Sequence, residues 1–135
     1  MSAFDRVMQT WRYVAVPRGD ARHAERTAEI LRAAGADAEL VLAGELHDRA
    51  KPMDTRLWHR VAAVLLEAFA PAMRTRFASG TGTLARYLAH AERGAELARR
   101  EGRSERVVRL IAGHHDAPRD ADERLLARAD REALP

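Results

Sequence analysis

The sequence contains no cysteine, and its 23 Lys and Arg residues include a single lysine, Lys51. The absence of cysteine excludes disulfide bridges, cysteine-ligated zinc sites, iron–sulfur clusters and catalysis by a thiolate. Any metal site in this chain must therefore be built from His, Asp and Glu side chains.

Long apolar runs are missing as well. No window approaches the roughly 18 consecutive apolar residues of a membrane-spanning helix. The first residues carry the charges of Asp5, Arg6 and Arg12, where a secretory signal needs an apolar segment. We therefore expect a soluble, cytoplasmic protein with no membrane partner, and at 135 residues we expect a single domain.

Charge of one sign does not dominate, because 23 basic residues face 20 acidic ones and the formal net charge is +3. The basic residues are spread along the chain beside Asp and Glu, which is typical of solvated, ion-paired helix faces. A nucleic-acid binder usually shows a concentrated basic stripe, so this pattern argues against such a partner. The oligomeric state cannot be predicted from these features.

Signals for β-strands are also sparse. Alanine is abundant, β-branched residues are few, and no segment alternates apolar and polar residues for long, so we predict an all-α fold. After an irregular start ending near residue 19, a helix is expected over 20–34, with Gly35 as its stop. Asp37 should cap a second helix that ends before Pro52.

The second half of the chain continues this helical pattern. The apolar segment from about residue 55, interrupted at Pro71, is predicted to be the most buried helix. Residues 78–83 form the clearest loop signal. Further helices are expected from about 84 to Gly102, from Ser104 through Ile111, and over the last 15 residues or so.

Histidine is the residue that points to chemistry, and the six histidines are His23, His47, His59, His90, His114 and His115. His47 and Asp48 follow the apolar run LVLAGEL, where burial without partners would cost about 2 kcal/mol, or far more for an ionised group. A divalent metal would satisfy both side chains. His59 lies outside this pattern and is expected to be structural.

Several phrases containing these residues occur in an order that resembles the HD-domain superfamily of metal-dependent phosphohydrolases. The phrases are His23 itself, ELHDRAK with His47 and Asp48, YLAHAERGAELA with His90, VVRLIAGHHD with His114, and LLARAD with Asp130. The resemblance covers residues 20–135 and implies a single helical bundle of five to seven helices.

The resemblance also implies a metal-ligand set. The positions of mononuclear family members correspond to His23, His47, Asp48 and Asp130, and the additional positions of binuclear members correspond to His90 and His114. Two divalent ions are then expected, with Asp48 bridging them and with Mn, Fe, Co, Ni or Zn, or alternatively Mg, as the metal. The ions would activate a water molecule that attacks phosphorus.

Residues on the substrate side follow from the same resemblance. Lys51 occupies the place of a lysine that contacts phosphate in binuclear members, and Arg26 matches a basic residue three positions after the first histidine. Helical spacing would put Asp48 and Lys51 on one face. His115 is a candidate substrate-side donor, and Asp116 a candidate for orienting an imidazole.

The substrate expected from the resemblance is a nucleotide or another small phosphorylated metabolite. HDRAKP is similar to the corresponding phrase of dinucleoside tetraphosphate hydrolases, whereas the GYP phrase of the HD-GYP phosphodiesterases is missing after HHD. Two alternatives remain open at this point: a di-iron oxygenase that uses the same ligands, and a metal-binding regulatory module without catalysis.

Overall fold

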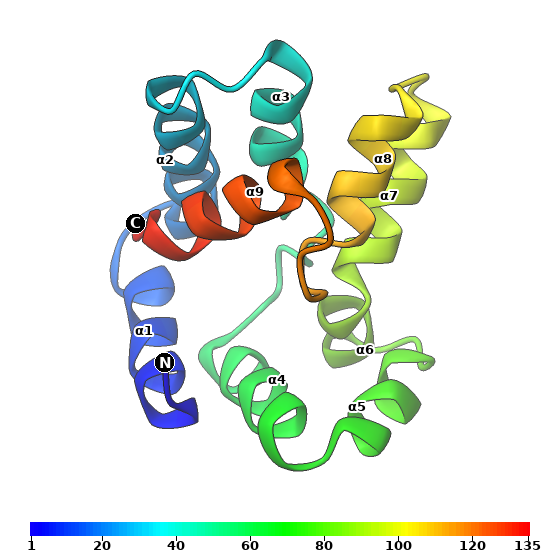
Figure 1. Cartoon of the computed structure of the whole chain (residues 1–135). Coiled ribbons are helices and arrows are strands. Elements are labelled where there is room, and N and C mark those ends of the chain that lie inside the picture. Colours follow the sequence, from blue (N-terminus) through cyan, green and yellow to red (C-terminus); the bar gives the residue numbers. More distant parts are fainter. The chain divides into compact units, whose positions relative to one another are not determined.

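The computed structural model describes residues 1–135 and contains nine α-helices and no strand (Figure 1). The helices are α1 (Ala3–Ala15), α2 (Gly19–Ala33), α3 (Ala38–Leu46), α4 (Leu57–Phe69), α5 (Pro71–Ala78), α6 (Thr83–Leu88), α7 (His90–Arg100), α8 (Glu105–Ala112) and α9 (Ala121–Glu132). The predicted all-α class is confirmed. The helix count exceeds the predicted five to seven.

The additional helices have local causes. The segment predicted as irregular forms α1, because Ser2 accepts a hydrogen bond from the Asp5 amide while the Asp5 side chain accepts from the Ser2 amide. Pro71 begins α5 instead of merely interrupting α4. The helix expected from residue 84 to 102 is divided at Ala89 into α6 and α7.

The helix ends follow the predicted chemistry. Asp37 caps α3 by accepting from the Leu40 amide, and Ser104 caps α8 by accepting from the Val107 amide. Gly35 and Gly102 have φ values of +79° and +77°, the left-handed conformation that glycine adopts without steric cost. Gly35 follows the end of α2 and Asp37 caps the start of α3, and these two signals help to set the position of His47.

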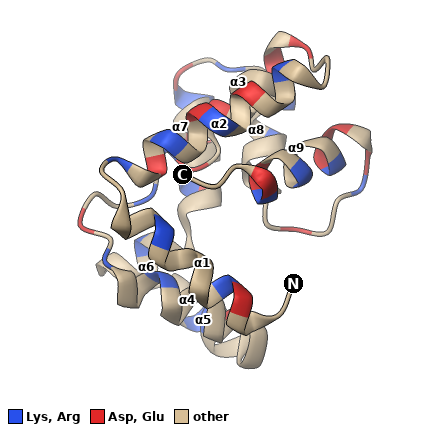
Figure 2. Cartoon of the chain, turned by 90° about the vertical axis from the view of Figure 1, so that its left-hand side faces the viewer, with Lys and Arg blue, Asp and Glu red and all other residues tan.

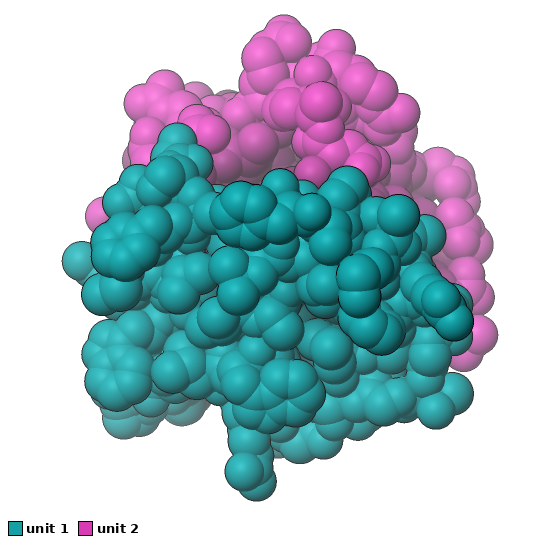
Figure 3. All heavy atoms as spheres, turned by 90° about the horizontal axis from the view of Figure 1, so that it is seen from below, with its two compact units in different colours: residues 1–19, 51–90 teal, residues 20–50, 91–135 magenta.

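The chain divides into two compact units, each made of two separate segments (Figure 3). Unit 1 comprises residues 1–19 and 51–90, and unit 2 comprises residues 20–50 and 91–135. Unit 1 therefore holds α1, α4, α5 and α6, whereas unit 2 holds α2, α3, α8, α9 and nearly all of α7.

The apolar core of unit 2 is formed by inward-facing side chains of α2, α3, α7, α8 and α9. Leu31, Val107, Leu110, Ile111 and Leu126 are all at most 1% exposed. Helix α8 packs against α3 and α9 and contributes the largest share of these side chains. Burial of this apolar surface is the main term holding α2, α3 and α9 together.

Gly44 allows α2 and α3 to approach closely within unit 2. A Cβ atom at this position would lie 2.5 Å from the Leu31 Cδ1 atom and 3.3 Å from the Thr27 Cγ2 atom. Because a side chain here would push the two helices apart, the absence of a Cβ brings the end of α3 next to α2. Those are the segments that carry His47 and His23.

Helix α4 of unit 1 packs against α1, α5 and α6, but it is not the most buried helix that the sequence predicted. Its buried side chains are His59, Arg60 and Val64, whereas Trp58 and Phe69 are 56% and 75% exposed. Apolar side chains thus lie on both sides of α4: Val64 is buried, whereas Trp58, Leu65 and Phe69 face solvent. No helix of the chain is both long and apolar enough to cross a membrane.

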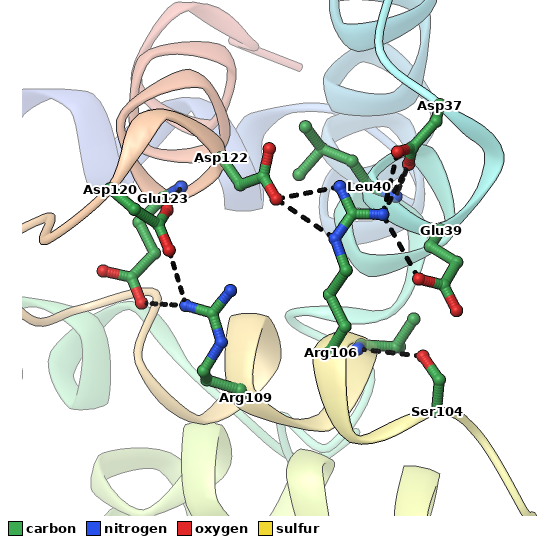
Figure 4. Close-up of polar contacts among 10 residues, drawn as sticks. Asp37, Glu39, Leu40, Ser104, Arg106, Arg109, Asp120, Asp122 and Glu123 are labelled. Atoms are coloured by element: carbon green, nitrogen blue, oxygen red, sulfur yellow. Dashed lines mark hydrogen bonds and ion pairs between the residues drawn. The ribbon is translucent and has the colours of Figure 1, made fainter.

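An ionic network ties the start of α9 to α8 in unit 2 (Figure 4). Glu123 is buried and accepts hydrogen bonds from the Arg119 amide at 2.7 Å and from the Arg119 and Arg109 guanidinium groups at 2.8 and 2.5 Å. Arg106 pairs with Asp122 on α9 and with Asp37 at the start of α3. The network therefore links α3, α8 and α9.

This network predicts a loss of stability in acid. The hydrogen bonds from Arg119 lower the pKa of Glu123 to about 2, below the value of about 4.3 in an unfolded chain. A carboxyl group with a depressed folded-state pKa stabilises the fold above pH 4.3, and this contribution is lost as the pH falls towards 2. We expect Glu123→Gln to lower the melting temperature at pH 7 and to match the parent chain near pH 2. A difference that stays constant with pH would contradict this assignment.

Candidate metal centre

The ring orientations of His23 and His47 are set by backbone carbonyls of unit 2. The Nδ1 atom of His23 lies 2.5 Å from the Ala133 carbonyl oxygen, and the Nδ1 atom of His47 lies 2.7 Å from that of Gly44. A carbonyl oxygen can only accept, so each Nδ1 carries the proton and donates it. In the neutral ring the Nε2 atom is then the one with a lone pair.

These two Nε2 atoms converge with two carboxylates. They lie 3.2 Å from each other, and 2.8 and 3.2 Å from the Asp130 Oδ1 atom. The Asp48 Oδ2 atom lies 3.6 Å from the His23 Nε2 atom and 3.5 Å from that of His47. Helices α2 and α9 and the turn after α3 supply the four side chains, and Figure 1 shows α9 ending beside α2.

Together these four groups present only acceptors when the imidazoles are neutral, and such a set repels itself unless positive charge lies among them. Burial lowers the pKa of His47, but the Asp48 charge and the Asp130 hydrogen bond outweigh it and raise this pKa to about 9. Burial raises the pKa of Asp130, but its hydrogen bonds with His23 and His47 hold it well below its ordinary value. Positive charge among these groups, either a proton on His47 or a bound cation, therefore stabilises the cluster.

The donor set fits a divalent metal ion in this role. The metal-binding atoms of His23, His47 and Asp48 all lie within 4.8 Å of one another, and all three residues are buried. Imidazole nitrogen and carboxylate oxygen are the ligand types that Mn, Fe, Co, Ni and Zn accept. Each imidazole donates a hydrogen bond from its Nδ1–H group to a carbonyl oxygen, which is the usual arrangement around a metal-ligating histidine.

The second Asp48 oxygen faces another histidine. The Asp48 Oδ1 atom lies 3.6 Å from the Nε2 atom of His114, whose Nδ1 atom lies 2.7 Å from the Ile111 carbonyl oxygen. His114 is thus oriented in the same way as His23 and His47. Because its two oxygens face different histidines, the Asp48 carboxylate has the geometry that a bridging ligand needs.

His115 and Asp116 follow His114 in the chain, and both are exposed. The His114 and His115 ring centroids are 4.0 Å apart. The Asp116 amide donates to the Gly113 carbonyl oxygen in a turn after α8. The structure thus places His115 beside a member of the cluster, and Asp116 on the adjacent turn.

Arg26 lies on α2 one turn after His23, in the predicted position. Its guanidinium group is 57% exposed and pairs with Glu29 at 3.0 Å, whereas His23 is 1% exposed. Arg26 therefore lies one helical turn from His23, but its side chain is exposed and not buried in the cluster.

His90 and Lys51 belong to unit 1. His90 is the first residue of α7, and its Nδ1 atom lies 2.6 Å from the Tyr87 carbonyl oxygen, as expected for a ring whose Nε2 atom carries the lone pair. Lys51 lies in a bend and not on a helix, so the prediction that helical spacing puts it on one face with Asp48 is wrong. The turn after α3 ends the helix before this position.

The Lys51 ammonium group lies over two aromatic rings of unit 1, at 5.6 Å from the Tyr13 centroid and 5.7 Å from the Tyr87 centroid. The Arg60 guanidinium lies over the same rings, at 5.1 and 5.8 Å. Arg60 is 4% exposed, and its burial was not predicted from the sequence. An arginine inside the apolar segment LWHRVAAVLL was the signal that could have identified it.

His59 provides a contrast within the same chain. Its Nδ1 atom accepts a hydrogen bond from the Arg56 amide at 2.8 Å at the start of α4, so its Nε2 atom carries the proton. Burial lowers the pKa of His59 and keeps the ring neutral. Its ring therefore caps a helix, in agreement with the expected structural role.

Comparison with known proteins adds one positive finding. Neither the comparison with curated proteins nor that with solved structures found a match. A family model described as HD domain matches residues 20–134, a range that begins three residues before His23 and ends four after Asp130. This range contains every residue of the candidate cluster, and the chain therefore belongs to the HD domain family.

Proposed function

We propose that this chain is a metal-dependent phosphohydrolase that acts on a nucleotide or another small phosphorylated metabolite. The observation that supports it most directly is the convergence of the His23 and His47 Nε2 atoms on the carboxylates of Asp48 and Asp130. Family membership supports the same reaction class, because HD domains are largely metal-dependent hydrolases.

His23, His47, Asp48 and Asp130 are the proposed ligands of one divalent ion. Asp48, His114 and His90 are proposed for a second ion, with Asp48 as the shared ligand. When bound, such ions supply Lewis acidity that activates water and stabilises negative charge on phosphoryl oxygens. The buried carbonyl partners hold the imidazoles in the required tautomer, so the chain does not have to reorganise when it binds its metal.

Other side chains of the proposed site act on the substrate. Lys51 is proposed to neutralise a non-bridging phosphate oxygen, since a compact ammonium group can approach one oxygen closely. His115 is proposed as a donor on the substrate side, because its ring is exposed beside the His114 ring. Arg26 and Asp116 are proposed in lesser roles at the edge of the site, as both are exposed.

A hydrolysis assay tests the proposed function. The purified chain loaded with Mn or Fe is expected to release phosphate or a nucleoside product from members of a nucleotide and phosphoester panel. His47→Ala should abolish turnover, whereas Arg32→Lys, an exposed arginine paired with Glu45, should leave it unchanged. Absence of hydrolysis across the panel, with parent and His47→Ala chains behaving alike, would contradict the proposal. Oxygen consumption without hydrolysis would favour the di-iron oxygenase alternative.

A further inference from the structure

An exposed apolar face covers one side of unit 1. Helix α1 presents Phe4, Met8 and Trp11 to solvent, with exposed fractions of 72%, 58% and 58%. The spacing i, i+4, i+7 places these three side chains on one stripe of the helix. The opposite side of α1 carries Thr10, which is buried, and Arg6, which pairs with Glu67 of α4 at 2.6 Å.

Helix α4, like α1, exposes large apolar side chains to solvent. Trp58, Leu65 and Phe69 have the spacing i, i+7, i+11 and are 56%, 43% and 75% exposed. The polar side chains of His59 and Arg60 are buried instead. Helix α4 packs against both α1 and α5, and α5 adds the exposed Met73 and Phe77, so the exposed apolar surface extends over three neighbouring helices. We call this surface, formed by Phe4, Met8, Trp11, Trp58, Leu65, Phe69, Met73 and Phe77, the apolar face.

The charge of unit 1 indicates what this face binds. Its residues include nine Lys or Arg and only three Asp or Glu, so unit 1 carries an excess of six positive charges, whereas the whole chain carries +3. Figure 2 shows α1, α4, α5 and α6 with blue segments and little red. The three acidic residues are already engaged inside the unit, Asp5 by Ser2, Asp54 by Thr83 and Glu67 by Arg6.

We propose that the apolar face docks peripherally on an anionic lipid surface. Aromatic and Met side chains that protrude from adjacent helices fit the boundary between headgroups and acyl chains. Exposed arginines such as Arg12 and Arg76, which lie beside the stripes, would contact the lipid phosphates. A second copy of the chain is the weaker occupant, because each copy would bring the same positive excess to the contact.

This inference departs from the expectation that the chain has no membrane partner. That expectation rests on the lack of an apolar run long enough to span a bilayer. The structure likewise contains no helix that is long and apolar enough to do so. Peripheral docking requires no such run, only an apolar face on folded helices. The inference does not depend on the proposed phosphohydrolase activity, and its test measures binding alone.

Tryptophan fluorescence of the full chain tests the proposal. The chain contains two tryptophans, Trp11 and Trp58, and both lie in the apolar face with more than half of each side chain exposed. Vesicles of phosphatidylcholine with about 30% phosphatidylglycerol should shift the emission to shorter wavelength and carry the chain upward in flotation. Vesicles of phosphatidylcholine alone, or roughly 0.5 M salt, should remove most of this binding.

Variants show whether the apolar face carries the binding. Phe69→Ser is expected to weaken partition roughly tenfold without unfolding the chain, because its side chain is exposed. Leu97→Ser, an exposed leucine on α7 outside unit 1, is the matched control and should bind as the parent does. Equal flotation of the Phe69→Ser chain, or no flotation of the parent, would overturn the proposal. A dimer that forms without vesicles and is lost in Phe69→Ser would assign the face to a second copy instead.

Discussion

Adding Mn²⁺ or Zn²⁺ to the metal-stripped chain is expected to raise its melting temperature by about 10 °C. At a free metal concentration of about a thousand times Kd, binding to the folded state alone contributes roughly 4 kcal/mol. The shift should be large here because a divalent ion brings two positive charges to the buried carboxylates of Asp48 and Asp130, whereas the metal-free cluster has only the proton that the raised pKa of His47 retains. Differential scanning calorimetry with and without metal measures this effect.

Two variants make this prediction specific. Asp48→Asn retains the size of the side chain but removes the charge that faces His23, His47 and His114, so the metal-dependent shift should be lost. His59→Gln, at a buried histidine outside the cluster, should lower the melting temperature but keep the shift. A shift that survives Asp48→Asn would place the metal elsewhere.

The number of ions follows from elemental analysis of the same samples. Two metal ions per chain would support the binuclear site, in which His90 and His114 are ligands and Asp48 bridges. One ion per chain would leave His23, His47, Asp48 and Asp130 as the complete set. His114→Ala distinguishes the two cases, because it should remove one of two ions but leave a mononuclear site intact. Retention of two ions by His114→Ala would contradict the ligand assignment.

Lys51→Arg is expected to retain the metal and lose most of the turnover, by roughly tenfold to a hundredfold. The lysine ammonium group lies over the Tyr13 and Tyr87 rings, where the Arg60 guanidinium already occupies neighbouring space. The planar guanidinium of a second arginine is larger and cannot approach a single phosphate oxygen in the same way. The substitution keeps the positive charge, so a loss of turnover would report on geometry.

Steady-state kinetics separates the possible origins of this effect. A fall in kcat with little change in KM would mean that Lys51 acts on charge that develops in the transition state. A rise in KM alone would mean that Lys51 contributes equally to binding of the ground state. Arg32→Lys is the control for an exchange of basic residues on an exposed helix face. Full activity of Lys51→Arg would remove Lys51 from the proposed site.

Local patterns of the sequence determined the helical class and several helix ends. Asp37 and Ser104 cap the helices that begin after them, as expected, and Gly35 and Gly102 have the backbone conformation expected of terminators. These signals depend on hydrogen bonds between residues close in the chain, so they can be read without knowledge of the fold. The helix count exceeds the predicted one because of the capping box of Ser2 and Asp5, the start of α5 at Pro71 and the division between α6 and α7 at Ala89.

The order of the histidine and aspartate phrases indicated the family, and the match over residues 20–134 confirms it. Only the tertiary structure brought His23, His47 and Asp130 within hydrogen-bonding distance, because Asp130 is 107 residues from His23 and 83 from His47 in the chain. The carbonyl partners of the imidazoles, Ala133 and Gly44, could not be predicted from the sequence either. They place the lone pair of each neutral ring on the Nε2 atom, which faces the carboxylates.

The direction in which each helix faces was also decided by the tertiary structure. The sequence by itself determined that the chain is helical, contains no cysteine, and has an apolar stripe on residues 57–69 and a histidine-rich set of candidate metal ligands. It could not determine that Trp58, Leu65 and Phe69 of α4 face solvent while Arg60 is buried. Periodicity shows that a helix has two faces, but only packing against neighbouring helices decides which of them is covered.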